Sequence, residues 1–173
     1  GINNQYAESR REFAGTTPTY WNVTVGRNSN MVDKSNISFE YLWGEWKPQL
    51  GSNINMIASN SHVLLQGSGS IVNELGGGSK NRISIEAINK LSSGKYNTVN
   101  TNAGYDGEIT IGKGASRNSI NLNNATKNYA VKDSGKENSI TLADSSENIS
   151  IELLESSILA KLVALRQISE RIE

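Results

Sequence analysis

The stretch from Gly114 to Glu152 decides the fold, and it reads GASRNSINLN, NATKNYAVK, DSGKENSITLA and DSSENISIE. Each unit opens on small and turn-forming residues, continues with a charged residue and an asparagine, and closes on two apolar residues separated by one position. Two apolar residues spaced in this way lie on the same face of a β-strand. The asparagines recur ten residues apart, at Asn118, Asn128, Asn138 and Asn148, and the apolar pairs are Ile120/Leu122, Tyr129/Val131, Ile140/Leu142 and Ile149/Ile151.

The spacing of the apolar pairs gives the period of the repeat. From Ile109 onward the first apolar residue of each pair advances by 11, 9, 11 and 9 residues, so two units span about twenty. We predict a mostly β protein built as an elongated β-solenoid, either a parallel β-helix or a triple-stranded β-helix shared by three chains. The alternative is a sandwich of ordinary β-hairpins, although hairpins do not require such regular asparagines.

Composition excludes several classes of function. The chain has 173 residues, zero formal net charge and no cysteine, which argues against nucleic-acid partners, disulfides and thiolate metal sites. No run of apolar residues is long enough for a membrane span, so we expect no membrane insertion. Only 36% of the residues are hydrophobic, and glycine, serine and asparagine are abundant, as in thin, turn-rich β architectures.

The chain divides into four predicted segments. Residues 1–17 form a lead-in, and residues 18–50 carry strands at 20–25 and 35–41 followed by an aromatic loop. The β-solenoid repeats occupy 51–152, with a break in the pattern at 87–91. Residues 153–173 form a short C-terminal α-helix, because the apolar period changes there from two to about 3.5.

The apolar residues of the predicted C-terminal helix form a stripe along one face, and the sequence leaves two interpretations of this stripe open. It could cap the repeats of its own chain, or it could join three chains in a coiled coil, since isoleucine at core positions favours three strands. The trimerisation residues would be Leu154, Ile158, Leu162, Leu165, Ile168 and Ile172.

An aromatic cluster near the N-terminus is the candidate carbohydrate-binding site. Aromatic rings stack on the apolar faces of sugars, while carboxylates accept hydrogen bonds from hydroxyl groups. Glu40 and Glu45 are the weaker candidates for a catalytic carboxylate pair. In the alternative interpretation the rings fill an interface with another domain or chain. The candidate binding residues are Trp21, Tyr41, Trp43, Glu45 and Trp46.

Other motifs predict structure rather than chemistry. The glycines at 76–78 precede Ser79 and Lys80 without the spacing of a phosphate-binding loop, and they indicate a turn. His62 is the single histidine, so we expect no histidine-based metal site. No other motif predicts a metal site or a cofactor. The repeated asparagines could present amides to glycans, but a repeated asparagine at a corner more often stacks and bonds turn backbone.

These repeats resemble a known family. The sequence contains units of the form Asn–Ser–Ile–x–Leu, as at 118–122 and 138–142, and its units are spaced about ten residues apart and followed by a predicted terminal helix. In this texture the sequence resembles the C-terminal β-helical stalks of bacteriophage tail fibres and tailspikes. The likeness extends over residues 20–172 and transfers no catalytic residue. It implies a homotrimer on the virion surface that binds or cleaves the polysaccharide of the host cell.

Three functions therefore stand as expectations. The first is a structural and receptor-binding module of a homotrimeric tail fibre that attaches to host surface polysaccharide. The second is the C-terminal part of a polysaccharide depolymerase, a glycosidase or a lyase. The third is a segment of a trimeric adhesin on a bacterial cell surface, whose sequences share the same asparagine- and serine-rich texture.

Overall fold

The computed structural model describes residues 6–9, 21–37, 50–75, 78–102, 104–123 and 126–154. Within these ranges the chain is mostly β, contains no α-helix, and forms two parallel sheets. The odd sheet contains β1 (Tyr6–Ser9), β3 (Asn30–Asp33), β5 (His62–Leu65), β7 (Arg82–Ile85), β9 (Glu108–Ile111), β11 (Lys127–Asp133) and β13 (Glu147–Leu153). The even sheet contains β2 (Trp21–Val25), β4 (Ser52–Met56), β6 (Ile71–Glu74), β8 (Thr98–Thr101), β10 (Ser119–Leu122) and β12 (Ser139–Leu142).

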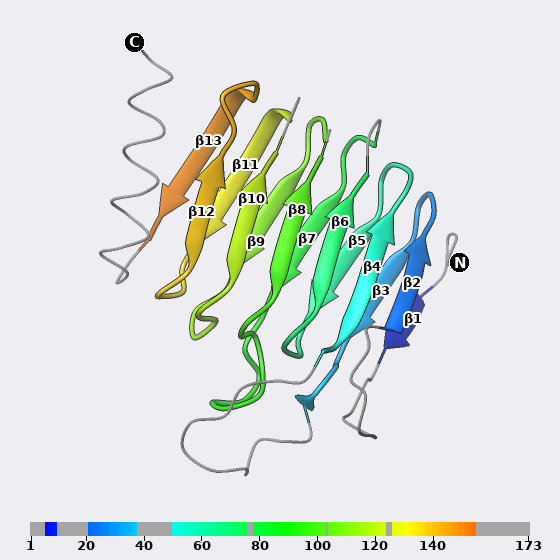
Figure 1. The fold of residues 1–173 in the computed structure, drawn as a ribbon, viewed down its shortest axis with the longest axis vertical. Coiled ribbons are helices and arrows are strands. Elements are labelled where there is room, and N and C mark those ends of the chain that lie inside the picture. The colour runs from blue at the N-terminus through cyan, green and yellow to red at the C-terminus, as the bar shows by residue number, and fades with distance from the viewer. Residues whose placement is uncertain are drawn as a thin grey trace.

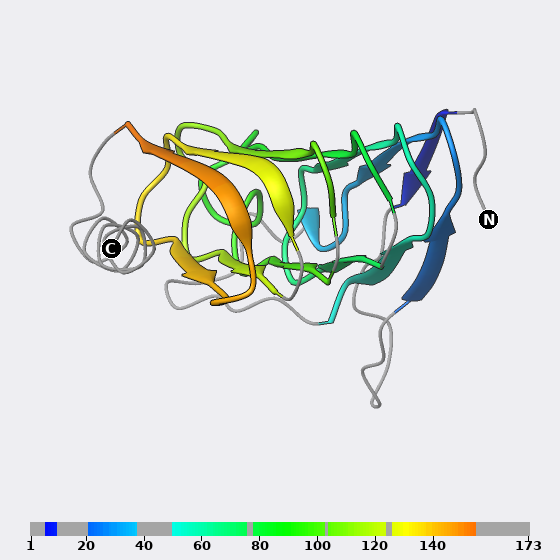
Figure 2. The same ribbon diagram turned by 90° about the horizontal axis from the view of Figure 1, so that it is seen from above.

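The chain alternates between the two sheets. Each strand pairs in parallel with the strands two before and two after it, so β10 lies between β8 and β12 while β11 lies between β9 and β13. Figure 1 shows the strands side by side in chain order, and Figure 2 shows the two sheets as facing layers. Since all described pairs are parallel, the alternative of ordinary antiparallel hairpins is wrong.

Stacked apolar residues fill the space between the sheets. Val99 pairs in register with Ile120, and Ile120 pairs with Ile140, 20 residues further on. Burying one such side chain contributes about 1.5–3 kcal/mol, whereas fixing each backbone residue costs about 1–2 kcal/mol. One unit of about ten residues with two buried side chains therefore cannot fold alone, and neighbouring units must stack. The predicted apolar pairs are confirmed as inward-facing residues in β10, β11, β12 and β13.

A buried ladder of side chains links the starts of the even strands. The backbone N–H of Asn97 donates to Asn118 Oδ1 at 2.9 Å, and that of Asn118 donates to Asn138 Oδ1 at 2.9 Å. The Asn118 amide also donates to the carbonyl of Gly94 at 2.9 Å. All three asparagines are about 1% exposed. At these positions asparagine therefore bonds turn backbone and cannot present its amide to a ligand.

The other asparagines of the ten-residue period have a different role. Asn128 and Asn148 lie within β11 and β13 with positive φ angles of 53° and 52°, a region that asparagine tolerates better than most residues. Both are exposed, and the amide of Asn148 donates to Asn128 Oδ1 at 2.6 Å. The repeat is thus one of twenty residues with two kinds of asparagine in it.

The outer face of the even sheet is polar. Asn121 donates to Asn100 Oδ1 at 2.9 Å, and Asn100 donates to Asn73 Oδ1 at 3.1 Å, each through the side-chain amide. These residues are in register on neighbouring strands. Such ladders satisfy amide groups along the stack while they keep this face hydrophilic.

The structure corrects several predicted boundaries. Residues 35–37 form a turn rather than part of a strand over 35–41, and the remainder of that strand lies outside the described residues. Residues 6–9 of the lead-in form β1, which pairs with β3. The predicted helix over 153–173 is wrong at its start, because Leu153 ends β13 and Leu154 continues without helix. Residues 155–173 lie outside the described residues.

Candidate ligand-binding site

The predicted aromatic site is represented in the described residues by Trp21 alone. Trp21 opens β2, the outermost described strand of the even sheet, and 45% of its surface is exposed. Trp21 pairs with the buried Ser52, so its side chain belongs to the row of inward-facing residues that runs across the even sheet. No further described strand of that sheet covers this row beyond β2. The exposure of Trp21 therefore follows from its place at the end of the stack. The other predicted binding and catalytic residues, Glu40, Tyr41, Trp43, Glu45 and Trp46, lie outside the described residues.

The predicted trimerisation stripe is also represented by one residue. Leu154 follows β13 and is 50% exposed. The remaining members, Ile158, Leu162, Leu165, Ile168 and Ile172, lie outside the described residues. Trimerisation therefore remains a prediction.

The connection from β7 to β8 departs from the regular repeat. The chain passes from an odd strand to the next even strand through the short connections 66–70 and 134–138, but between β7 and β8 this connection spans 86–97. It contains the stretch 87–91, where the sequence pattern was predicted to break. The additional residues form a loop on the side of the stack.

Short polar contacts order this loop. The side-chain oxygen of Asn89 accepts from the backbone N–H of Ser92 at 2.9 Å. The hydroxyl of Ser93 accepts from the N–H of Ile88 at 2.7 Å and donates to the carbonyl of Gln66 at 2.6 Å. Ser92 and Ser93 are fully buried. The loop is therefore fixed from within and tied to the neighbouring connection.

The same loop contacts the start of the longest connection in the described fold. The hydroxyl of Ser92 donates to the carbonyl of Ile37 at 2.8 Å. Ile37 immediately precedes residues 38–49, which carry the predicted aromatic cluster and lie outside the described residues. Both long connections thus run from an odd strand to an even strand, and they contact each other at Ser92 and Ile37.

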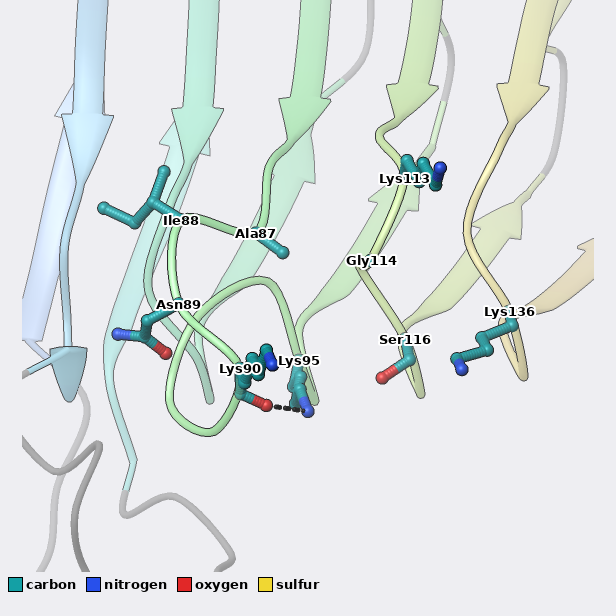
Figure 3. A pocket seen from close by; sticks show the side chains of 9 residues that line it. All are labelled: Ala87, Ile88, Asn89, Lys90, Lys95, Lys113, Gly114, Ser116 and Lys136. Atoms are coloured by element: carbon teal, nitrogen blue, oxygen red, sulfur yellow. Dashed lines mark hydrogen bonds between the residues drawn. The ribbon is translucent and has the colours of Figure 1, made fainter.

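A pocket of about 400 Å³ opens between the loop and the two connections that follow it. This volume falls within the range of about 300–1,000 Å³ that is usual for small-molecule sites. In Figure 3 the loop forms one wall, and the β9–β10 and β11–β12 connections form the other. The pocket is lined by Ala87, Ile88, Asn89, Lys90, Lys95, Lys113, Gly114, Ser116 and Lys136.

Four of the lining residues are lysines, and none of the lining residues is acidic. Among the described residues no carboxylate lies within ion-pair distance of these lysines. The nearest acidic residue in sequence, Glu137, instead pairs with Arg117 at 3.1 Å. Lys95 Nζ donates to the carbonyl of Lys90 at 2.5 Å, which holds one ammonium group at the pocket wall. The pocket therefore has uncompensated positive charge.

The buried carboxylates are structural. Asp33 is fully buried and accepts hydrogen bonds from the hydroxyls of Ser35, at 2.6 Å, and Ser70. Burial raises the pKa of Asp33, and the serine hydrogen bonds partly oppose this. Burial also raises the pKa of Asp133, which accepts from the N–H of Gly135 at 2.9 Å. Because neither side chain reaches solvent, neither can act on a bound polysaccharide.

Glu74 is a third buried carboxylate, and it lies in the apolar core. It is 1% exposed, and the Tyr129 hydroxyl donates to its Oε2 at 3.3 Å. Its second oxygen, Oε1, has no hydrogen-bond partner. Burial raises the pKa of Glu74 to about 7, although the side chains of Tyr129 and Asn81 act in the opposite direction.

His62 also has a structural role. It lies on the outer face of β5, half-buried, with Nε2 2.9 Å from the hydroxyl of Ser84. Burial lowers the pKa of His62, and the neighbouring Arg82 adds to this. In the part of the chain that the structure describes, no group of three or more histidine, cysteine, aspartate or glutamate side chains could hold a metal ion. Nor does any helix there have the length and apolar character to cross a membrane.

The sequence analysis missed the lysine-lined pocket. The available signal was the recurrence of Ser–Gly–Lys at 93–95 and 134–136. In the structure Lys95 and Lys136 both bridge to Ser116, so they occupy equivalent positions on the connections that flank the β9–β10 connection. Comparison with protein-family models, with curated proteins and with solved structures finds no match to this chain.

Proposed function

We propose that this chain is a β-solenoid segment of an extracellular attachment fibre, and that its loop pocket binds surface polysaccharide. The β-solenoid is supported by the alternation of strands between two parallel sheets with in-register stacking. The polar outer ladder supports a solvent-exposed, stiff rod. The apolar residues Ile158, Leu162, Leu165, Ile168 and Ile172 support homotrimeric assembly, either on a virion or, alternatively, on a bacterial surface.

One observation carries the binding role, namely the pocket formed by the 86–97 connection. A regular stack needs no such loop for its stability, and loops on a rigid scaffold are where binding residues concentrate. Ile88, which is 50% exposed, lies on the loop that lines the pocket, and other lining residues carry amide, hydroxyl and ammonium groups. An apolar patch with a few polar groups around it suits a sugar ring, whose faces are apolar and whose edges are hydroxylated.

The depolymerase alternative has less support in the described residues. Glycoside hydrolysis generally requires two carboxylates about 5–10 Å apart, whereas the pocket is lined by no carboxylate. If this protein cleaves polysaccharide, the acidic residues would have to come from Glu40 and Glu45 or from another part of the molecule.

Binding to an immobilised panel of purified bacterial surface polysaccharides tests the proposal. We expect binding to at least one polysaccharide, no release of reducing ends, and a solution mass close to three times 18.8 kDa by light scattering. Ile88→Ala should weaken binding several-fold, whereas the matched variant Ile57→Ala should not. Ile57 is 54% exposed but lies on an even-to-odd connection, away from the pocket. Equal binding by the two variants would reject the pocket as the polysaccharide site.

A further inference from the structure

We infer that the loop pocket selects an acidic saccharide, so that the attachment target is a surface polysaccharide with carboxylate or sulfate substituents. This inference rests on the proposed function and names the class of ligand for the same site. It starts from the charge of the pocket, where four of nine lining residues are lysines and none is acidic.

The lysines are arranged along the direction of stacking. Lys95, Ser116 and Lys136 occupy equivalent positions on three successive connections, each bridged to the next. Parallel strands lie about 4.8 Å apart, so the backbones of Lys95 and Lys136 are about 10 Å apart. Lys113 precedes Ser116 on the middle connection, and Lys90 extends the row on the loop (Figure 3). Repeated anionic groups along one polymer could contact this row at several points, whereas a single small anion could not.

The positive charge is free to act on a ligand. Glu86, which precedes Lys90 on the same connection, and Glu137, which is next to Lys136, are each engaged elsewhere. Glu86 Oε2 accepts from the side-chain amide of Gln66 at 3.0 Å, and Glu137 pairs with Arg117 at 3.1 Å. Since the chain as a whole has zero formal net charge, the row of lysines is a local feature rather than a consequence of overall composition.

The apolar part of the pocket distinguishes a saccharide from other polyanions. Ala87 and the half-exposed Ile88 provide a surface for the C–H face of a sugar ring. A single-stranded nucleic acid would instead require aromatic rings on which its bases stack. No aromatic side chain lines this pocket. The observations therefore favour an acidic glycan, and an oligonucleotide becomes an outcome of the test.

Calorimetric titration with defined oligosaccharides tests the inference. The probes are an oligogalacturonate, its methyl ester, an oligosialic acid, a heparin fragment and an oligodeoxythymidine, at low and high NaCl concentration. The proteins are the parent, the pocket variant Lys113→Gln/Lys136→Gln, and the control variant Lys80→Gln/Lys132→Gln. All four lysines are exposed, and only the first pair lines the pocket, so thermal unfolding should be the same in all three proteins.

We expect the parent to bind at least one acidic probe, with affinity that falls as salt screens the charges. The pocket variant should bind it about tenfold more weakly, which corresponds to about 1.4 kcal/mol, and the control variant should stay within about twofold of the parent. If oligogalacturonate is the probe that binds, the parent protein should bind its methyl ester more weakly than the acid. The affinity of the parent for the ester should not exceed the affinity of the pocket variant for the acid.

Four results would overturn the inference. The pocket variant could bind the acidic probe as tightly as the parent does, or the parent could bind the acid and its methyl ester equally. The parent could also bind none of the acidic probes, or bind an oligodeoxythymidine more tightly than any of them. The proposed function fails separately, if the panel of surface polysaccharides yields no ligand at all. A neutral polysaccharide that binds in an Ile88-dependent manner would leave the proposed function intact and refute the acidic specificity alone.

Discussion

Replacing Glu74 with glutamine should remove most of a pH dependence that this carboxylate gives to the stability of the fold. Glu74 is 1% exposed, and one of its oxygens has no hydrogen-bond partner. Burial favours its neutral form and raises its pKa from 4.5 to about 7. The protonated form can therefore remain in the core at little cost, whereas the charged form is poorly compensated there.

The direction of the effect follows from linkage. Between pH 4.5 and 7 the folded protein holds a proton on Glu74 that the unfolded chain has lost. The contribution of this proton to stability is fully present below pH 4.5, is lost as the pH rises through 7, and changes little above that. For these two pKa values, raising the pH from 5 to 8 should lower the free energy of unfolding by on the order of 2–3 kcal/mol.

Urea unfolding followed by circular dichroism at several pH values measures this. The parent should lose stability between pH 5 and 8, and Glu74→Gln should lose less by about 2 kcal/mol or more. Asp33 and Asp133 also have raised pKa values, but they remain in both proteins, so the difference between the two profiles isolates Glu74.

Glu152→Gln is the matched control, because it removes an exposed carboxylate from the outer face of β13. Its profile should follow that of the parent. Parallel profiles for the parent and Glu74→Gln, within about 0.5 kcal/mol, would refute the argument that Glu74 is neutral in the folded core.

Three further predictions concern the stack itself. Asn118→Ala should lower the free energy of unfolding by about 1–3 kcal/mol, because it leaves the buried N–H of Asn97 and carbonyl of Gly94 without this partner; a loss below 0.5 kcal/mol in urea unfolding would contradict the ladder. Ser119→Cys/Ser139→Cys should form an intramolecular disulfide on oxidation, because these residues are in register on neighbouring strands, about 4.8 Å apart. In the control Ser119→Cys/Thr141→Cys the two cysteines are out of register by two residues and should not form a disulfide. Equal disulfide yields for the two variants by mass spectrometry would reject the strand pairing. Removing residues 155–173 should abolish trimerisation in light scattering, and an unchanged trimer would show that this segment has no role in assembly.

The sequence predicted the elements that repeat and missed the features that do not. Apolar pairs such as Ile120/Leu122 were found because inward-facing residues of a strand alternate with outward-facing ones. The ten-residue asparagine period was found as well, but spacing alone could not separate the buried Asn118 from the exposed Asn128. The two differ in backbone conformation and hydrogen-bond partners, and these depend on the stacking of neighbouring strands.

The lysine pocket could not be predicted for a related reason. Residues 87–91 were identified as a break in the pattern, yet a break does not indicate where the loop will fold. Lysines on turns are exposed in either case, so their type and spacing do not distinguish a binding site from a solvated surface. Only the in-register stacking of the connections places Lys95 and Lys136 on the same row.

The central claim, that acidic polysaccharide binds in the loop pocket, is tested most directly by chemical footprinting of lysines. The protein is acetylated briefly with and without the polysaccharide to which it binds, and mass spectrometry gives the extent of modification at each lysine. We predict protection of Lys90, Lys95, Lys113 and Lys136, while Lys80 and Lys132, which are exposed outside the pocket, react as before. Equal protection of all six lysines, or protection of Lys80 and Lys132 alone, would contradict the claim.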